Sequence, residues 1–426
     1  MSDPRKIAYD VLVRCASAEQ YSNIALDTAI KRSELTPPDR GLLTALVYGV
    51  IERQLTLDAI IDGLCDRGSE EISPDVRTLL RLGLYQLAYL DRVPDHAAVN
   101  ETVNMAGKRS RGFVNAILRA FIRGGKQIPI PNKETEPENY LSVKYSFCTE
   151  LCNTFIKNFG LERTEELFAA FGEHPDLTLR TNTLRISREE LIEKIEEQGI
   201  HALPTKESKV GIRVCDKFPV TELYGFSDGL FFVQDEASQL CVKALDARAG
   251  MRVLDACACP GSKSFGAAID MQNKGLVMSC DLHKNKLSLV ESGAARLGIS
   301  ILTTEERDAR HPNEEWLGTF DRVLCDVPCS GFGVFAKKPE LRYKDPATSK
   351  ALPDIQLAIL KNASTYVKIG GKLVYSTCTL LPTENEENVS RFLNENNNFT
   401  LIEQRTLYPD RGGTDGFFYA VMERVK

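Results

Sequence analysis

Two cysteines in the C-terminal half, Cys329 and Cys378, each follow a short apolar run that is typical of a buried strand. Cys329 stands in the string DVPCSG (326–331), and Cys378 stands in YSTCT (375–379). A single cysteine is most often an inert core residue, whereas a thiolate is a strong nucleophile. Because open α/β sheets bind ligands just beyond their strand ends, we expect thiol chemistry at these two positions.

A second group of residues, ahead of both cysteines, suits a nucleotide. The string VLDACACPGSK (253–263) predicts a strand, a turn of small residues and a helix, whose first N–H groups favour a negative ligand group. Asp281 ends the next expected strand, where a carboxylate can accept hydrogen bonds from ribose hydroxyls. Asp308 and Asp326 stand where the following two strands end. The turn lacks the GxGxxG spacing, which favours an adenosyl ligand over NAD.

Thiols beside an adenosyl pocket suggest a methyl transfer to C5 of a cytosine. C5 is a poor nucleophile, but a thiolate that adds to C6 makes C5 enamine-like, and a carboxyl group near N3 supports the charge on the ring. The C5 proton then leaves, the thiolate is expelled, and a second thiol can assist its release. The residues alone do not decide whether Cys329 or Cys378 attacks.

The elements that position these residues follow from the hydrophobic pattern. From Ala237 onward, short apolar runs alternate with helical patterns, which predicts a parallel sheet with helices on both faces. The expected strands are 252–257, 275–281, 320–326 and 372–376.

The part of the chain before Ala237 divides into two further regions. Residues 1 to about 125 are helical throughout and predict a bundle with short connections. A linker is expected over 124–144, where glycines, prolines and charges gather. Strands over 177–184, 211–214 and 229–234, with a helix over 187–198, predict a small α/β domain. The predicted domains are therefore 1–130, 131–230 and 231–426.

The net charge of −6 does not indicate nucleic-acid binding, so contacts with phosphate groups would need local basic patches. Two segments offer them: residues 108–126, which contain no acidic residue, and the loop after Cys329. Basic runs usually form a solvated face, but we favour RNA-backbone contact for both. The residues expected to make it are Lys108, Arg109, Arg111, Arg119, Arg123, Lys337, Lys338 and Arg342.

The twelve cysteines lack the doubled CxxC spacing of a zinc site, and the five histidines form no ligand spacing, so we expect no metal. The sequence shows no apolar leader and no apolar run of about 18 residues. We therefore expect a cytoplasmic protein with reduced thiols that does not enter a membrane, and a monomer.

Four strings carry a resemblance to a known family. In their order, DACACPGSKS (255–264), CDLHKNKL (280–287), DVPCSGFGV (326–334) and YSTCTLLPTENEENV (375–389) resemble the motifs of RNA cytosine-C5 methyltransferases. Residues 80–100 and 112–119 are similar to a NusB-type RNA-binding domain, and GTDGFF (413–418) also resembles the family. The resemblance covers nearly the whole chain and is strongest to the Sun/RsmB type, which modifies small-subunit ribosomal RNA.

The resemblance implies an all-α NusB-like bundle, a small RRM-like α/β domain and a doubly wound, Rossmann-like methyltransferase domain. It implies methylation of C5 of a cytosine in 16S rRNA with S-adenosylmethionine, through a covalent bond between cysteine and C6, on RNA that is free or early in assembly. One alternative is the same chemistry on a transfer RNA or another ribosomal cytosine. The other is a NusB-like RNA-binding protein whose methyltransferase domain is inactive.

The resemblance also implies a role for each site residue. Cys378 is the expected nucleophile, Cys329 aids release, and Asp326 contacts the base and lines the cofactor pocket. The expected cofactor-binding residues are Cys257, Ala258, Cys259, Pro260, Gly261, Ser262, Lys263, Asp281, Asp308 and Asp326.

The cofactor turn departs from the family pattern CAAPGGKT at three positions: Cys259 replaces an alanine, Ser262 a glycine and Ser264 a threonine. Ser262 matters most. If that position requires a positive φ or a very close backbone approach, its Cβ costs on the order of 1 kcal/mol and weakens cofactor binding.

Overall fold

The computed structural model describes residues 3–16, 22–65, 71–173 and 176–426. The chain forms two compact units: a helical unit, Met1–Ala169 with Lys337–Pro346, and a sheet unit, Ala170–Ala336 with Ala347–Lys426. The chain therefore leaves the sheet unit after Ala336 and returns to it at Ala347. Within the described residues, no helix has both the length and the apolar character needed to cross a membrane.

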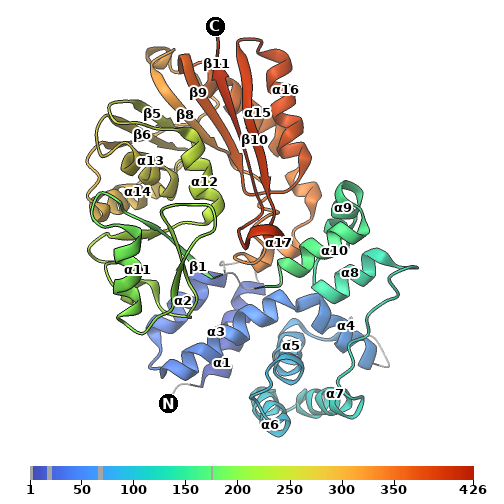
Figure 1. The fold of residues 1–426 in the computed structure, drawn as a ribbon. Helices are drawn as coiled ribbons and strands as arrows, with labels where there is room; N and C mark the ends of the chain where they lie inside the picture. Colours follow the sequence, from blue (N-terminus) through green and yellow to red (C-terminus); the bar gives the residue numbers. More distant parts are fainter. Residues whose placement is uncertain (1–2, 17–21, 66–70, 174–175) are drawn as a thin grey trace. The chain divides into compact units, whose positions relative to one another are not determined.

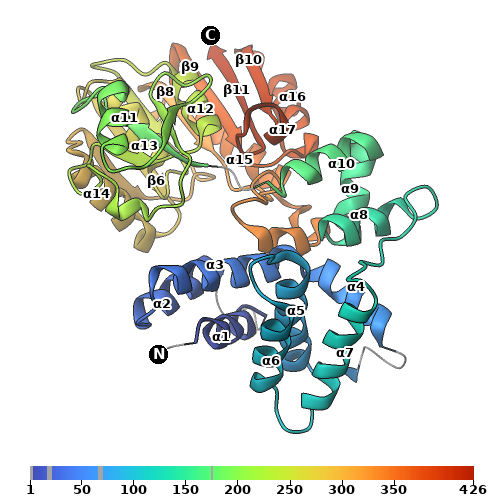
Figure 2. The ribbon, with the colours of Figure 1, turned by 60° about the horizontal axis from the view of Figure 1, so that its bottom comes forward.

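The helical unit confirms the predicted bundle. Apolar residues at helical spacing, such as Leu80, Leu84 and Leu87 of α5, are buried in a single core. Figure 2 shows α5, α6 and α7 packed side by side. The α-helices are α1 (Pro4–Ala16), α2 (Ser22–Arg32), α3 (Pro37–Glu52), α4 (Gln54–Leu64), α5 (Pro74–Tyr89), α6 (Asp95–Met105), α7 (Arg111–Arg123), α8 (Pro137–Tyr145), α9 (Thr149–Phe159) and α10 (Leu161–Ala170).

The second half of the predicted linker is a helix. α8 begins at Pro137, a position where proline costs no hydrogen bond, and its Leu141 is fully buried. The following helices add an aromatic cluster in which the rings of Phe147 and Phe168 stack with their centroids 3.9 Å apart. The charged residues and the proline of this segment predict a loop, but Leu141 and the neighbouring aromatic residues form a core on which the helix packs.

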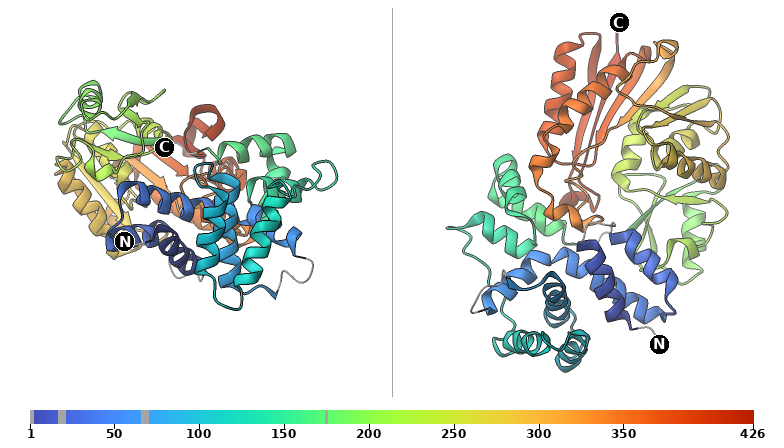
Figure 3. Two further views of the ribbon diagram at one scale, coloured as in Figure 1. Left: turned by 90° about the horizontal axis from the view of Figure 1, so that it is seen from below. Right: turned by 180° about the vertical axis from the view of Figure 1, so that it is seen from behind.

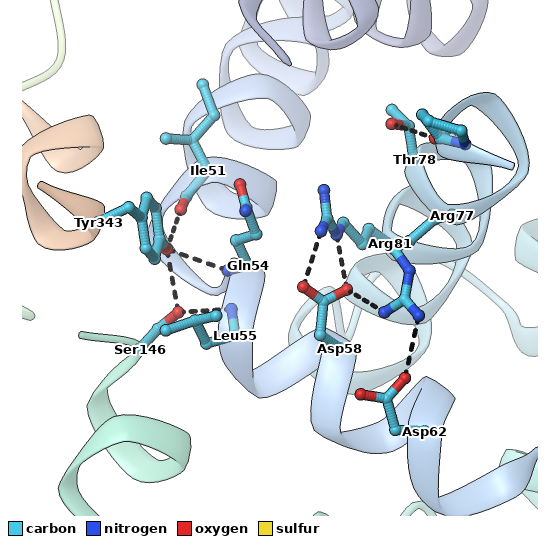
Figure 4. Close-up of polar contacts among 11 residues, drawn as sticks. Ile51, Gln54, Leu55, Asp58, Asp62, Arg77, Thr78, Arg81, Ser146 and Tyr343 are labelled. Carbon is cyan, nitrogen blue, oxygen red and sulfur yellow. Dashed lines mark hydrogen bonds and ion pairs between the residues drawn. The ribbon is translucent and has the colours of Figure 1, made fainter. Parts of the chain in front are cut away.

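The segment Lys337–Pro346 packs within the helical unit, where it forms the short 3-10 helix η4 (Pro339–Tyr343) against α3. The hydroxyl of Tyr343 donates to the carbonyl of Ile51, lies 3.0 Å from Ser146 Oγ and accepts the N–H of Gln54 at 3.2 Å (Figure 4). Burial raises the pKa of Tyr343 to about 12. An ordered network of side chains thus ties this segment to α3 and α4.

A second polar cluster joins α4 to α5 in the same unit (Figure 4). Asp58 accepts two hydrogen bonds from Arg81, at 2.8 and 2.7 Å, and one from Arg77 at 3.1 Å. All three side chains are largely buried, so this paired geometry fixes the crossing of the two helices.

The sheet unit begins with a small domain. Its four strands are antiparallel in the order β2-β3-β1-β4. The helix α11 (Arg188–Glu196) is capped by Ser187, whose side chain accepts the N–H of Glu190. The first strand ends at Thr181 because the next residue, Asn182, turns its side chain to the carbonyls of Gly229 and Leu297. The strands are β1 (Leu177–Thr181), β2 (Ala202–Pro204), β3 (Gly211–Val214) and β4 (Phe231–Val233).

The second part of the sheet unit is a seven-stranded sheet in the order β10-β11-β9-β8-β5-β6-β7. Its strands are β5 (Arg252–Asp255), β6 (Leu276–Asp281), β7 (Leu302–Glu306), β8 (Phe320–Asp326), β9 (Val367–Thr377), β10 (Phe399–Leu407) and β11 (Phe417–Arg424). The five strands from β5 to β9 are mutually parallel, as predicted. The C-terminal pair β10 and β11 is antiparallel, so the sheet is mixed.

Helices cover both faces of this sheet (Figures 1 and 3). One face is covered by α12, α13 and α14 and the other by α15 and α16, with a separate apolar core beneath each layer. These helices are α12 (Glu236–Leu245), α13 (Ser262–Asp270), α14 (Lys284–Leu297), α15 (Leu352–Ser364) and α16 (Glu386–Glu395), followed by the short α17 (Pro409–Gly412).

We predict that Tyr343→Phe lowers the free energy of unfolding of the helical unit by about 2 kcal/mol, because it removes hydrogen bonds from a buried network. Urea unfolding would measure the change. The matched control is Tyr224→Phe, since that side chain is 41% exposed, and it should change the free energy by less than about 0.5 kcal/mol. Equal effects of the two variants would contradict the packing of η4.

Candidate active site

Four parallel strands end at one edge of the large sheet, and each brings a polar residue there. β5 ends at Asp255, β6 at Asp281, β8 at Asp326 and β9 at Thr377. β8 lies between β5 and β9, which places Asp326 between the small-residue turn after β5 and the cysteine that follows β9. This edge is where open α/β sheets bind their ligands.

The structure brings the two cysteines into contact at this edge. The sulfur atoms of Cys329 and Cys378 lie 3.2 Å apart, and the backbone N–H of Cys378 points at the sulfur of Cys329 at 3.3 Å. The hydrogen bond to Cys378 and burial raise the pKa of the Cys329 thiol well above its ordinary value. Cys329 is therefore a protonated thiol at neutral pH, and its S–H can stabilise a negative charge on the sulfur of Cys378.

Asp326 is held by a cation and a hydroxyl. Lys263 Nζ donates to Asp326 Oδ2 at 2.6 Å, and Ser376 Oγ donates to Asp326 Oδ1 at 2.8 Å. Burial opposes the charged form of Lys263, but the negative charge of Asp326 outweighs it, so the pKa of the lysine is raised. The ammonium also lies 5.2 Å from the centre of the Phe417 ring. A fixed ion pair therefore stands beside the thiols.

The backbone around the two cysteines rests on residues that the sequence analysis did not assign. Glu384 Oε2 accepts the N–H of Ser330 at 2.9 Å, and the side chains of Ser330 and Thr379 share a hydrogen bond of 2.8 Å. Asn385 accepts from Thr377 Oγ1 at 2.6 Å and donates to the carbonyl of Thr379 at 2.9 Å. In the sequence, the only indication of this role is that Glu384 and Asn385 follow shortly after Cys378.

The turn after β5 has the close packing expected of a ligand-binding turn. Gly261 has a φ of +111°, and a Cβ added there would lie 2.6 Å from the Phe265 ring, so only glycine fits without a shift. Ser262 is the first residue of α13 and has no positive φ. The positive-φ condition for backbone strain is therefore not met at Ser262.

The expected cofactor residues on this turn lie together between β5 and α13. The N–H of Ala258 donates to the carbonyl of Cys280 at 2.7 Å, and Cys259 precedes Pro260. Burial raises the pKa of Cys257 well above its ordinary value, and burial with the charge of Asp281 raises that of Cys259 to about 12. Both thiols are thus protonated and suit packing more than nucleophilic attack.

The two further carboxylates differ in their surroundings. Asp281 Oδ1 accepts the N–H of His283 at 2.9 Å, and its side chain is partly exposed at the end of β6. Asp308 lies two residues beyond β7, where hydrogen bonds from Arg310 hold its pKa at about 2. Asp308 is therefore already engaged by a cation.

Asp255 is a buried acid that the sequence analysis did not assign a role. Ser264 Oγ donates to Asp255 Oδ2 at 2.7 Å, and Ser279 donates to Ser264 at 2.8 Å. The other oxygen, Oδ1, is buried without a hydrogen-bond partner among the described residues. Burial raises the pKa of Asp255 to about 7. The backbone of Cys257 and the charge of Lys263 oppose this shift, but burial outweighs them.

Seven of the eight expected RNA-binding residues are exposed in the helical unit. Arg342 is the exception and its assignment is corrected: it is 1% exposed, donates to the carbonyl of Tyr145 at 3.1 Å and stacks on Phe147. A guanidinium enclosed in this way cannot reach a phosphate at the surface. The exposed residues are Lys108, Arg109, Arg111, Arg119, Arg123, Lys337 and Lys338.

In the described part of the chain, no three His, Cys, Asp or Glu side chains are grouped as a metal site. All twelve cysteines lie in that part and are free thiols. The sheet order and its carboxylate-lined edge define a Rossmann-like methyltransferase fold.

Comparisons with known proteins agree with this class. The family model described as "16S rRNA methyltransferase RsmB/F" matches residues 242–423, the "NusB family" model matches 2–123, and an RsmF/B-like ferredoxin-like domain model matches 151–221. The chain belongs to the RsmB/F family of 16S rRNA methyltransferases. The resemblance inferred from the motifs, and with it the three-part fold, is confirmed.

Individual relatives cover the chain from end to end. It is 37% identical to the "Probable ribosomal RNA small subunit methyltransferase B" of Bacillus subtilis (strain 168), over 99% of this chain and 98% of that protein. It is 32% identical to the "Ribosomal RNA small subunit methyltransferase B" of Pseudomonas syringae pv. tomato, over 99% and 97%. The crystal structure of PH0851 matches with a TM-score of 0.82 and 26% identity, over 100% and 99% of the two chains.

We predict that Asp255→Asn removes part of the pH dependence of stability. A raised pKa means that the native state binds its proton more tightly, so the wild type loses stability as the pH rises from 3.8, the ordinary value, through about 7. Urea unfolding at pH 5 and pH 8 should show the wild type losing about 2–3 kcal/mol more than Asp255→Asn over this interval. Parallel losses in the two proteins would contradict a buried acid at this position.

Proposed function

We propose that this protein methylates C5 of a cytosine in 16S rRNA with S-adenosylmethionine, through a covalent bond between Cys378 and C6. The observation that carries the proposal is the contact of the two sulfurs, 3.2 Å apart, beside the Lys263–Asp326 ion pair. Family membership supplies the ribosomal substrate, and the paired thiols favour a base that needs nucleophilic activation.

The proposed reaction begins at Cys378. Its thiol first loses its proton to water, and the thiolate, stabilised by the S–H of Cys329, adds to C6. N3 takes up a proton from water, donates a hydrogen bond to the Asp326 carboxylate and gives the proton back when the adduct breaks down. C5 would then take the methyl group, whose bond to the cofactor's sulfur would break with the electron pair left on that sulfur. The C5–H bond breaks, its proton passes to water, and the C5–C6 double bond re-forms. The C6–Sγ bond breaks with its electron pair on Cys378, and the Cys329 thiol stabilises that sulfur again.

The cofactor would be held by the turn from Cys257 to Lys263 with Asp281, Asp308 and Asp326. S-adenosylmethionine supplies an electrophilic methyl group on sulfur. The closely packed turn at Gly261 supports this fit. Asp281 would accept the ribose hydroxyls, and Lys263 holds Asp326 oriented toward the ligand side of the sheet.

The RNA would be held in part by the exposed cations of the helical unit, in and next to α7. Enzymes that act on a base must take it out of the stack, because the reacting atoms are inaccessible within a duplex. RNA that is free or early in assembly permits such a movement. We accordingly place the reaction in the cytoplasm, carried out by a monomer on such a substrate.

We predict that the two cysteine variants fail at different steps. With labelled S-adenosylmethionine and a 16S rRNA transcript, Cys378→Ala should lose turnover, at least 1000-fold, because no C6 adduct forms. Cys329→Ala should also turn over slowly but accumulate a covalent protein–RNA adduct on a denaturing gel.

A transfer RNA transcript is the specificity control and should accept no methyl group. Full activity of Cys378→Ala, or the absence of an adduct from every variant, would contradict the covalent mechanism. Faster labelling of the transfer RNA would contradict the assignment to 16S rRNA.

A further inference from the structure

Glu384 is a carboxylate buried between the two cysteine loops. It ends the 3-10 helix η6 (Pro382–Glu384) and is only 2% exposed. Its Oε2 accepts the N–H of Ser330 at 2.9 Å and the side-chain amide of Gln356 at 2.7 Å. Its own backbone carbonyl accepts the hydroxyl of Tyr375 at 2.6 Å. These hydrogen bonds hold the Glu384 side chain in one orientation.

These bonds act on both sides of Cys329. Ser330 follows the cysteine, and the carbonyl of Pro328, which precedes it, accepts the amide of Gln356 at 2.9 Å. Glu384 and Gln356 together therefore fix the backbone that carries Cys329. The loop of Cys378 has a different anchor, because Asn385 binds Thr377 and Thr379. The two thiols are thus positioned by two neighbouring side chains with separate contacts.

We propose that Glu384 is a positioning residue for the release step, since its carboxylate holds Cys329 where that thiol meets the sulfur of Cys378. The proposal rests on the proposed function, in which Cys378 leaves C6 with its electron pair while the C5 proton passes to water. The negative charge of Glu384 also contributes to the raised pKa of Cys329, after the hydrogen bond to Cys378 and burial. Both effects keep Cys329 as a hydrogen-bond donor.

The test compares two adjacent variants in the full-length protein. Glu384→Ala should accumulate the covalent adduct with 16S rRNA, as Cys329→Ala does, and lower turnover at least 10-fold. Asn385→Ala should lower the rate of adduct formation instead, since it releases the loop of Cys378. Glu384→Gln retains an oxygen that can accept from Ser330 and Gln356, so it should release product within about threefold of the wild type.

Leu191→Ala is the control for a general loss of stability, because it leaves a cavity in the core of the small domain. It should trap no adduct. Equal loss of adduct formation and turnover in Glu384→Ala, with the adduct still trapped by Cys329→Ala, would overturn the role of Glu384 alone. No adduct from Cys329→Ala would overturn the proposed function itself. If Glu384→Ala does not fold, Glu384→Asp replaces it and should trap the adduct, because the shorter side chain cannot reach Ser330 and Gln356 together. Rapid release from that variant would overturn the role.

Discussion

The contact between the sulfurs of Cys329 and Cys378 depends on the pairing of β8 with β9. The two strands are parallel neighbours, and Asp326 of β8 lies opposite Ser376 of β9. Cys329 follows Asp326 by three residues, and Cys378 follows Ser376 by two. A shift of one residue would move a thiol by roughly 3.3 Å along the strand and turn the side chains to the opposite face. The 3.2 Å contact is therefore a direct product of sheet register.

Buried charge at this edge is stabilised by pairing rather than by solvent. Lys263 and Asp326 lie 2.6 Å apart, and an ion of either sign alone in this place would carry a large desolvation cost. Asp255 forms no ion pair within the described residues, and burial raises its pKa to about 7 although the charge of Lys263 opposes the shift. At the thiol pair, the hydrogen bond to Cys378 and burial raise the pKa of Cys329 and keep that thiol protonated.

The sequence predicts most of the elements that carry the site. Alternating apolar runs give the bounds of β8, and the strand-end rule brings Cys329 and Cys378 to one edge. Long-range packing could not be predicted: the antiparallel β10–β11 pair and the packing of Lys337–Pro346 in the helical unit depend on partners far along the chain. Arg342 shows the reason, because an arginine in a basic loop has the same local pattern whether it is exposed or buried. Glu384 was missed likewise, because polarity alone does not reveal burial.

The most direct measurement of the central claim is the identity of the cysteine that bonds to RNA. A 16S rRNA transcript with 5-fluorocytidine in place of cytidine carries no C5 proton to lose, so a methylated adduct cannot release its thiol. Peptide mapping of that adduct by mass spectrometry should place the nucleotide on Cys378, with Cys329 unmodified. A nucleotide on Cys329, or no cross-link in the presence of S-adenosylmethionine, would contradict the account.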